Sequence, residues 1–273
     1  MQNNNKLGYT RYGNEQGLPL CLIHGWGLDS SFLLPIAQMF PERDIYLIDL
    51  PGYGQSYAQS ALSGDFNATV EALAHTLVPY ADVMAVSMGA LYVLRALSHK
   101  DTPPLSSLIT ICSNARFPGD PNWPGFGSEL IYKCRTLLTP QRCKRLLHLF
   151  IKLQDLKISD KSKPHPPSAD FLQQALEQCR LPSYETLMHG INIASYVDVR
   201  ADLENLDLPC LQLFGAKDRL VPAALTYALQ SAELRSSYIF VNSAHNPYLT
   251  EPVLFERVVR EFYDKVQSFY AGH

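Results

Sequence analysis

The sequence lacks the long apolar runs and the strong charge that mark several classes of protein. No run approaches the roughly 18 apolar residues of a membrane-spanning helix, and the polar start, Met1–Lys6, holds no apolar signal core. The net charge of −3 offers no overall attraction to nucleic acid or to an anionic membrane. We therefore expect a cytoplasmic protein that binds neither.

Paired cysteines are also missing. The six cysteines are scattered, and none forms a Cys-x-x-Cys pair. This distribution predicts reduced thiols, and it predicts neither a disulfide framework nor a zinc site. The chain has 273 residues, of which 47% are hydrophobic and 18% are charged. It is long enough for one globular core with an inserted subdomain. We also expect a monomer.

One stretch carries a pattern that is typical of a catalytic serine. An apolar run ending at Val86 leads into Ser87, and a helix-like pattern begins directly after it. A strand that turns sharply into a helix pushes its central side chain into a cleft, and it needs small neighbours such as Ala85, Gly89 and Ala90. The usual pattern begins with Gly, where this chain has Ala85. Ser87 is therefore a candidate nucleophile, although a serine that only caps a helix would give a similar pattern.

Buried strands alternate with helices along both ends of the chain. This order predicts an α/β fold with a mostly parallel, doubly wound sheet, whose ligand cleft lies at the carboxyl ends of the strands. The expected strands cover residues 20–23, 45–49, 83–86, 108–112, 210–214 and 237–241, and the expected helices include 30–40, 65–80 and 252–270.

The alternation stops between residues 113 and 199, where proline-rich joints separate helical patterns. We interpret this segment as a helical cap inserted into the core, so that 1–112 and 200–273 form the two parts of the core. Thr139-Pro140 resembles a helix start, and an apolar stripe that includes Phe150 follows it.

Asp218 and His245 each come directly after a predicted strand, as Ser87 does. The chain order Ser, Asp, His is the order that this architecture uses for a catalytic triad. A serine needs a base to take its proton, and an imidazole, with an unperturbed pKa of about 6.5, is suited to that task. Asp198 and Asp202 are the other candidates for the acid of the triad. We favour Asp218 because its turn follows a buried strand and directs the side chain inward.

The first predicted strand runs into His24-Gly25-Trp26-Gly27-Leu28. His24 has no second ligand at a zinc-like spacing, so we expect it to order this loop by hydrogen bonds. In hydrolases with this order of elements, the residue at Trp26 and the residue after the nucleophile, here Met88, supply backbone N–H groups to an oxyanion hole.

The chain resembles the α/β-hydrolase superfamily over its whole length, and within it the pimeloyl-[acyl-carrier protein] methyl ester esterases of biotin synthesis. The narrower similarities lie in Trp123-Pro124-Gly125 and in Ser237-Tyr238-Ile239-Phe240. These esterases usually have Gly-Trp-Ser-Leu-Gly at the serine, whereas this chain has Ala85-Val86-Ser87-Met88-Gly89. We expect Val86 to reshape a substrate pocket that also involves Trp26 and Phe150.

The resemblance implies a cofactor-free serine carboxylesterase that removes the methyl group from a pimeloyl methyl ester carried by acyl carrier protein. Two other enzymes fit the same residues, a broad short-chain esterase and a carbon–carbon bond hydrolase. A small-molecule receptor with slow turnover is the alternative outside enzymes. A nucleophilic Asp, as in dehalogenases, is excluded by Ser87.

Positive charge is concentrated in the predicted cap. Between residues 128 and 163 the sequence has nine basic and three acidic residues. Arg145, His148 and Lys152 recur at helical spacing, and Arg142 and Lys144 flank them. Because carrier proteins are acidic, we expect Arg142, Arg145 and Lys152 to form a docking surface; an ordinary solvated helix face is the alternative.

Overall fold

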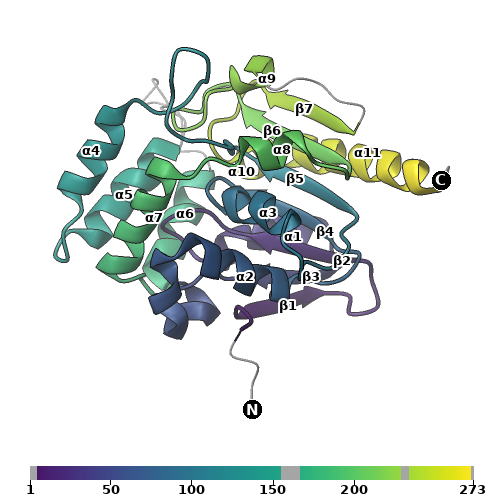
Figure 1. The fold of residues 1–273 in the computed structure, drawn as a ribbon, viewed down its shortest axis with the longest axis horizontal. Helices are drawn as coiled ribbons and strands as arrows, with labels where there is room; N and C mark the ends of the chain where they lie inside the picture. The colour runs from purple at the N-terminus through teal and green to yellow at the C-terminus, as the bar shows by residue number, and fades with distance from the viewer. Residues whose placement is uncertain (1–4, 155–166, 229–233, 272–273) are drawn as a thin grey trace.

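The computed structural model describes residues 5–154, 167–228 and 234–271, and its centre is a seven-stranded sheet (Figure 1). All neighbouring strands are parallel except β1 and β3. Across the sheet the strands lie in the order β1 (Tyr9–Gly13), β3 (Asp44–Ile48), β2 (Pro19–Ile23), β4 (Asp82–Val86), β5 (Ser107–Ile111), β6 (Cys210–Gly215) and β7 (Arg235–Phe240). The predicted α/β architecture with a mostly parallel sheet is confirmed.

Helices cover both faces of this sheet, and the alternation of side chains along the strands explains why. In β4, Val83 and Ala85 pack into one core cluster, while Met84 and Val86 pack into another on the opposite face. The first cluster includes α2 (Phe66–Thr76), α3 (Gly89–Leu97) and α8 (Arg200–Glu204). The second includes α1 (Leu34–Met39), α10 (Pro247–Thr250) and α11 (Pro252–Ala271).

Four further helices lie between β5 and β6 in the chain, within the segment predicted as a cap. They are α4 (Ser128–Leu137), α5 (Cys143–Gln154), α6 (Pro167–Gln178) and α7 (Tyr184–Tyr196), and they stand together beside one end of the sheet (Figure 1). Leu147 of α5 and Leu187 of α7 share an apolar cluster with Leu28 and Phe32, which follow β2. The cap therefore packs on loops at the carboxyl ends of the strands.

Three local predictions need correction. β1 was not predicted, because as an edge strand it leaves Tyr9 and most of its other residues exposed and has no buried apolar run. Residues 54–64, for which no helix was predicted, form the 3-10 segment η2 (Gly54–Gly64). The helix α5 begins at Cys143 because Thr139 and Arg142 close a turn instead of starting the helix.

Two short elements complete the described chain, the 3-10 turn η1 (Ser30–Leu33) and the helix α9 (Leu225–Ala228). No helix among the described residues is long and apolar enough to cross a membrane.

Candidate active site

Ser87 occupies the turn between β4 and α3 with a backbone φ of +52°, a left-handed value that non-glycine residues rarely adopt. Its N–H donates to the carbonyl of Ile111 over 2.9 Å, and its carbonyl accepts from the hydroxyl of Ser113 over 2.7 Å. Both partners lie at the end of the neighbouring strand β5, so the strained turn is held in place by the sheet. The Ser87 side chain is half-buried and lines two pockets.

The loop after β2 approaches this turn closely at Gly25, which leaves little room for a side chain there. A Cβ atom on Gly25 would lie 3.0 Å from the Cβ of Ser87 and 3.1 Å from the carbonyl oxygen of Val86. A side chain there would fill the space next to the Ser87 hydroxyl. The loop after β2 therefore approaches Ser87 closely enough to share a site with it.

His245 is paired with Asp218 in the interior. Its Nδ1 atom lies 2.7 Å from a carboxylate oxygen of Asp218, and the two side chains are 2% and 0% exposed. If Nδ1–H donates to this carboxylate, the lone pair remains on Nε2. Nε2 is buried and has no hydrogen-bond partner among the described residues. Because His245 and Ser87 line the same pocket, that nitrogen is available to a proton from this site.

The Asp218 carboxylate is held by its own turn. Its other oxygen accepts from the backbone N–H groups of Leu220 at 2.8 Å and Val221 at 3.1 Å. The rival acids are engaged elsewhere, since Asp198 binds Arg200 over 2.7 Å and Asp202 binds Arg95 over 3.1 Å. The Arg200 guanidinium also lowers the pKa of Asp198. Only Asp218, of these three acids, contacts His245.

Cys112 lies beside this pair and was not singled out by the sequence. Its sulfur and the donor atoms of Asp218 and His245 lie within 4.8 Å of one another, a grouping that can in principle hold a metal ion. Burial and the Asp218 charge, however, raise the pKa of the Cys112 thiol well above its usual value. A cysteine binds a metal ion as its thiolate, and Asp218 and His245 already bind each other, so the arrangement fits an acid–base pair better than a metal site.

The two backbone N–H groups proposed as oxyanion donors belong to the residues that follow Gly25 and Ser87. Those of Trp26 and Met88 have no hydrogen-bond acceptor within the described residues. The Gly25 Cβ position is 3.7 Å from the Met88 nitrogen, which brings the loop carrying Trp26 next to the start of α3. Helix N-termini favour anionic groups because their first N–H groups are unsatisfied.

His24 orders this loop, as expected from the sequence. Its Nε2 accepts from the N–H of Leu50 over 2.9 Å, and its Nδ1 lies 2.7 Å from the carbonyl of Gly25. Burial lowers the pKa of His24 despite the nearby Asp49 carboxylate, so the ring is neutral. A neutral ring with one donor and one acceptor satisfies both of these backbone groups.

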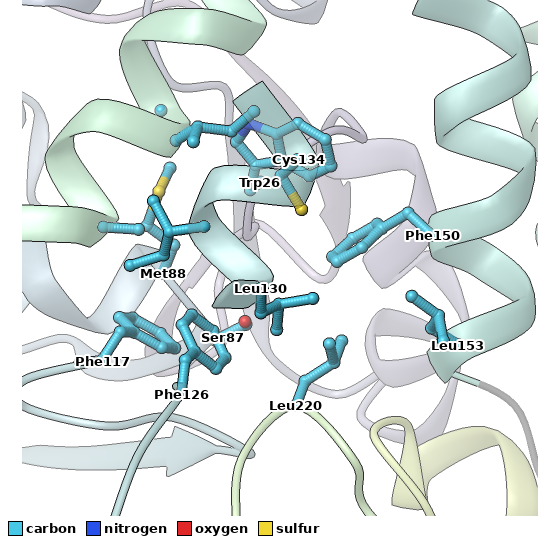
Figure 2. A pocket seen from close by; sticks show the side chains of 14 residues that line it. Trp26, Ser87, Met88, Phe117, Phe126, Leu130, Cys134, Phe150, Leu153 and Leu220 are labelled. Carbon is cyan, nitrogen blue, oxygen red and sulfur yellow. The ribbon is translucent and has the colours of Figure 1, made fainter. Parts of the chain in front are cut away.

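The larger of the two pockets is apolar and has an empty volume of about 640 Å³. Figure 2 shows the Ser87 hydroxyl facing a ring of hydrophobic side chains that includes Trp26 and Phe150. The indole of Trp26 and the phenyl group of Phe150 meet edge to face, with centroids 4.8 Å apart. The remaining lining side chains include Phe117, Phe126, Leu130, Leu153 and Leu220. An acyl chain is a suitable occupant.

The second pocket is smaller, about 370 Å³, and more polar. Trp26, Ser87 and Phe150 border both pockets, whereas His245, Gln154 and Asn246 border only the second among the pockets described. Val86, which we expected to shape a substrate pocket, lines this second pocket. All three proposed pocket residues therefore border the second pocket, and Trp26 and Phe150 also border the first.

The basic residues of the cap differ in their surroundings. Lys144 and His148 pair with Glu177 of α6, at 2.6 and 3.3 Å. Arg142, Arg145 and Lys152 are exposed, and within the described part of the chain no carboxylate lies within ion-pair distance of them. The basic residues 157, 161 and 163 lie outside the described residues.

Gln154 and Asn246 are polar residues near the site that the sequence reasoning missed. Gln154 ends α5 on the helix's buried face, and Asn246 directly follows His245. A signal was present for Gln154, because it continues the apolar stripe of Leu147 and Ile151 at helical spacing with a polar side chain. A polar residue at such a position needs a buried partner.

The sequence pattern of the Alpha/beta hydrolase family matches residues 22–258. Several relatives carry the name pimeloyl-[acyl-carrier protein] methyl ester esterase. The protein from Legionella pneumophila (strain Corby) is 32% identical over 254 residues, covering 92% of this chain and 97% of its own. Those from Vibrio cholerae serotype O1 and Serratia marcescens are each 30% identical, covering 90% and 93% of this chain and 94% of their own.

Solved structures support the fold. A bromoperoxidase from Bacillus anthracis superposes with a TM-score of 0.81 at 19% identity, and an esterase from Exiguobacterium antarcticum with 0.79 at 18% identity. Each comparison covers 94% of both chains. Since these two proteins have different names, the shared fold alone does not identify a reaction.

Proposed function

This chain belongs to the alpha/beta hydrolase family, and from that premise we propose that it hydrolyses the methyl ester of pimeloyl-acyl-carrier protein in biotin synthesis. The chain is an ester hydrolase, in keeping with relatives that match over about nine-tenths of its length. We also propose the identity of the ester, the carrier protein that holds it, and a location in the cytoplasm together with that carrier.

In the first half of the reaction, Ser87 attacks the ester carbonyl while His245 Nε2 takes its proton. Asp218 holds the imidazole through Nδ1 and stabilises the imidazolium that forms. The oxyanion accepts hydrogen bonds from the N–H groups of Trp26 and Met88. When the carbonyl reforms, the C–O bond to the leaving alcohol breaks, His245 gives its proton to the leaving oxygen, and methanol departs.

In the second half, water attacks the acyl group on Ser87. His245 takes a proton from the water, the same N–H groups hold the second oxyanion, and the proton passes to the Ser87 oxygen as the acyl bond breaks. The products are methanol and the free carboxylic acid, so one water is consumed for each ester. The reaction uses no group other than side chains, backbone N–H and water, so no cofactor enters the proposal.

The apolar pocket supports an acyl chain of several methylenes as substrate. Removing one CH₂ group from water contributes about 0.8 kcal/mol, so a pimeloyl chain gains several kcal/mol from a lining such as that around Phe117 and Leu220. A short acyl group would contact only part of this apolar lining. This favours the pimeloyl ester over a preference for short esters.

The exposed face of α5 supports a protein carrier. Arg142, Arg145 and Lys152 are basic and free of ion pairs within the described residues, and Leu149 and Leu153 expose apolar surface on the same helix. Leu153 also lines the apolar pocket. An acidic carrier steered to this face would therefore deliver its attached chain beside the entrance to the site.

The observation that carries the proposal is the buried His245–Asp218 pair, whose imidazole lines the second pocket together with Ser87. The test is growth of a biotin-requiring strain that lacks its own methyl ester esterase. We expect the wild-type chain to restore growth without biotin and Ser87→Ala to fail at equal expression. Fast hydrolysis of a p-nitrophenyl ester without complementation would instead support a broad esterase.

A further inference from the structure

The last residue of α5 reaches from the cap to the loop that carries His245. Gln154 is 6% exposed, and it occupies a helix face whose other members, Leu147 and Ile151, are apolar. A buried amide costs free energy unless its hydrogen bonds are satisfied. A glutamine at this position therefore stabilises the fold only if its hydrogen bonds contribute more free energy than the packing of a leucine would.

Those contacts go to two consecutive residues of the His245 loop. The N–H of His245 donates to the Gln154 carbonyl over 3.3 Å. The side-chain amide of Asn246 donates from Nδ2 to Gln154 Oε1 over 3.0 Å, between residues 92 positions apart in the sequence. One cap residue thus holds both the backbone of His245 and the side chain that follows it.

Beyond Asn246 the loop is fixed by further bonds. Asn246 Oδ1 accepts from the Tyr248 hydroxyl over 3.2 Å, and its carbonyl accepts from the N–H groups of Leu249 and Thr250. Asn246 and Tyr248 are 4% and 2% exposed. The Gln154 contact is therefore one end of a buried chain of hydrogen bonds that extends into α10.

We propose that Gln154 is a positioning residue, which fixes the His245 loop against the end of α5 and so keeps the Nε2 atom of His245 in the pocket it shares with Ser87. The assignment rests on the esterase proposed above. Asp218 restrains the imidazole at Nδ1, but it does not restrain the loop's backbone. The Gln154 contacts supply that second restraint from the cap.

The same helix joins three parts of the proposed reaction. Arg145 and Lys152 lie on its exposed side, Phe150 and Leu153 line the apolar pocket, and Gln154 contacts the His245 loop. Because α5 is a single continuous helix, a displacement of the cap at this point reaches the proposed base directly. This link makes the orientation of the cap a determinant of turnover.

The test uses purified full-length variants and a p-nitrophenyl ester, so that it does not depend on the carrier. Gln154→Met and Gln154→Leu keep a comparable volume but remove the acceptor for Asn246, and Gln154→Glu retains it. Gln173→Leu makes the same chemical change at an exposed position of α6. We expect kcat to fall about 10-fold in the Met and Leu variants, with KM within about 2-fold of wild type.

The Glu variant should recover most of the lost kcat, and Gln173→Leu should match wild type. Labelling of Ser87 by a serine-directed phosphonate should slow by the same factor in the Met and Leu variants. Unchanged kcat in a folded Met or Leu variant, a change in KM alone, or a Glu variant as slow as Met would overturn the assignment. If neither apolar variant folds, the Glu variant decides alone, since a 10-fold loss there contradicts the assignment.

Failure of the proposed esterase function would give a different set of activities from failure of the role of Gln154. If Ser87→Ala retains the esterase activity of wild type, the proposed nucleophile is wrong whatever Gln154 does. If Ser87→Ala is inactive and Gln154→Met is fully active, only the positioning role fails.

Discussion

Asp218 and His245 lie at the ends of neighbouring strands and meet through a 2.7 Å contact between a carboxylate oxygen and Nδ1. The strands β6 and β7 are parallel, so the loops after them leave the sheet at the same edge. Neither side chain has more than 2% exposure. This contact distinguishes Asp218 from Asp198, which is 39% exposed and pairs with Arg200.

The contact predicts that the two acids differ strongly when each is changed to its amide. Asp218→Asn should lower kcat by about 10³- to 10⁴-fold, because an amide can no longer hold the imidazole in the form that accepts a proton at Nε2. Asp198→Asn should stay within about 3-fold of wild type. Steady-state rates with a p-nitrophenyl ester measure both variants, and a larger loss in Asp198→Asn would show that the acid was assigned to the wrong residue.

The positions of these residues could be predicted because the evidence for them is local. Ser87 and Asp218 follow the buried strands β4 and β6, and His245 follows β7, an apolar run in which only Phe240 is buried. Parallel strands bring their carboxyl ends to one edge, so three loops far apart in the sequence had to meet there. The fold and the location of the site follow from the same pattern.

The contacts across the cap could not be predicted, because no local pattern specifies them. The partner of Gln154 is 92 residues away, and the alternation along β4 does not say that Val86 meets the smaller pocket. The pairing of Lys144 and His148 with Glu177 depends on how α5 and α6 pack together. The edge strand β1 was missed for a related reason, since its exposed side chains carry little apolar signal.

The basic face of α5 predicts a difference between carrier-linked and free esters. Changing Arg142, Arg145 and Lys152 together to Glu should lower kcat/KM for the carrier-linked methyl ester by at least about 10-fold, most strongly at low salt, because charge steering is screened by ions. A small free ester should be turned over at the wild-type rate.

The matched control changes three exposed basic residues away from the cap, Lys100, Arg257 and Lys265, to Glu. This variant has the same net charge but keeps the α5 surface, so it should retain activity on the carrier-linked ester. Equal losses in the two triple variants would assign the effect to overall charge. An equal loss on both substrates in the α5 variant would indicate damage to the pocket.

The buried His24 predicts a pH-dependent loss of stability. Burial lowers the pKa of His24 in the folded protein, whereas in the unfolded chain it is near the usual value of about 6.5. Below that pH the unfolded chain binds more protons, so the free energy of unfolding falls as the pH falls towards the folded-state pKa. His24→Gln keeps an acceptor for Leu50 but cannot titrate.

Urea unfolding from pH 7.5 to pH 5 measures this effect. The wild type should lose stability more steeply than His24→Gln, by up to about 1.4 kcal/mol per pH unit, although the variant is expected to be less stable at pH 7.5. All other titrating groups are shared and cancel in the difference. Parallel stability curves for the two proteins would mean that His24 does not titrate abnormally.

The contact between Trp26 and α7 predicts that Gly190→Ala lowers the activity but changes the stability little. Its Nε1 donates to the Leu187 carbonyl over 2.9 Å, and its ring covers Gly190, where an added Cβ would collide with Cδ1 of the indole. Gly190→Ala should therefore displace Trp26, which lines both pockets and supplies a proposed oxyanion N–H. Misplacing such a donor costs up to about 10²-fold in rate.

Alanine also favours the helical backbone over glycine by about 1 kcal/mol, which offsets part of the steric cost in α7. We therefore expect kcat/KM for a p-nitrophenyl ester to fall at least 10-fold while Tm changes by only a few degrees. Gly127→Ala is the control, since it adds the same methyl group where no atom of the described residues, other than its chain neighbours, lies within 4 Å. Wild-type activity in Gly190→Ala would mean that the position of Trp26 does not limit the reaction, whereas a large drop in Tm would assign the loss to unfolding of the cap.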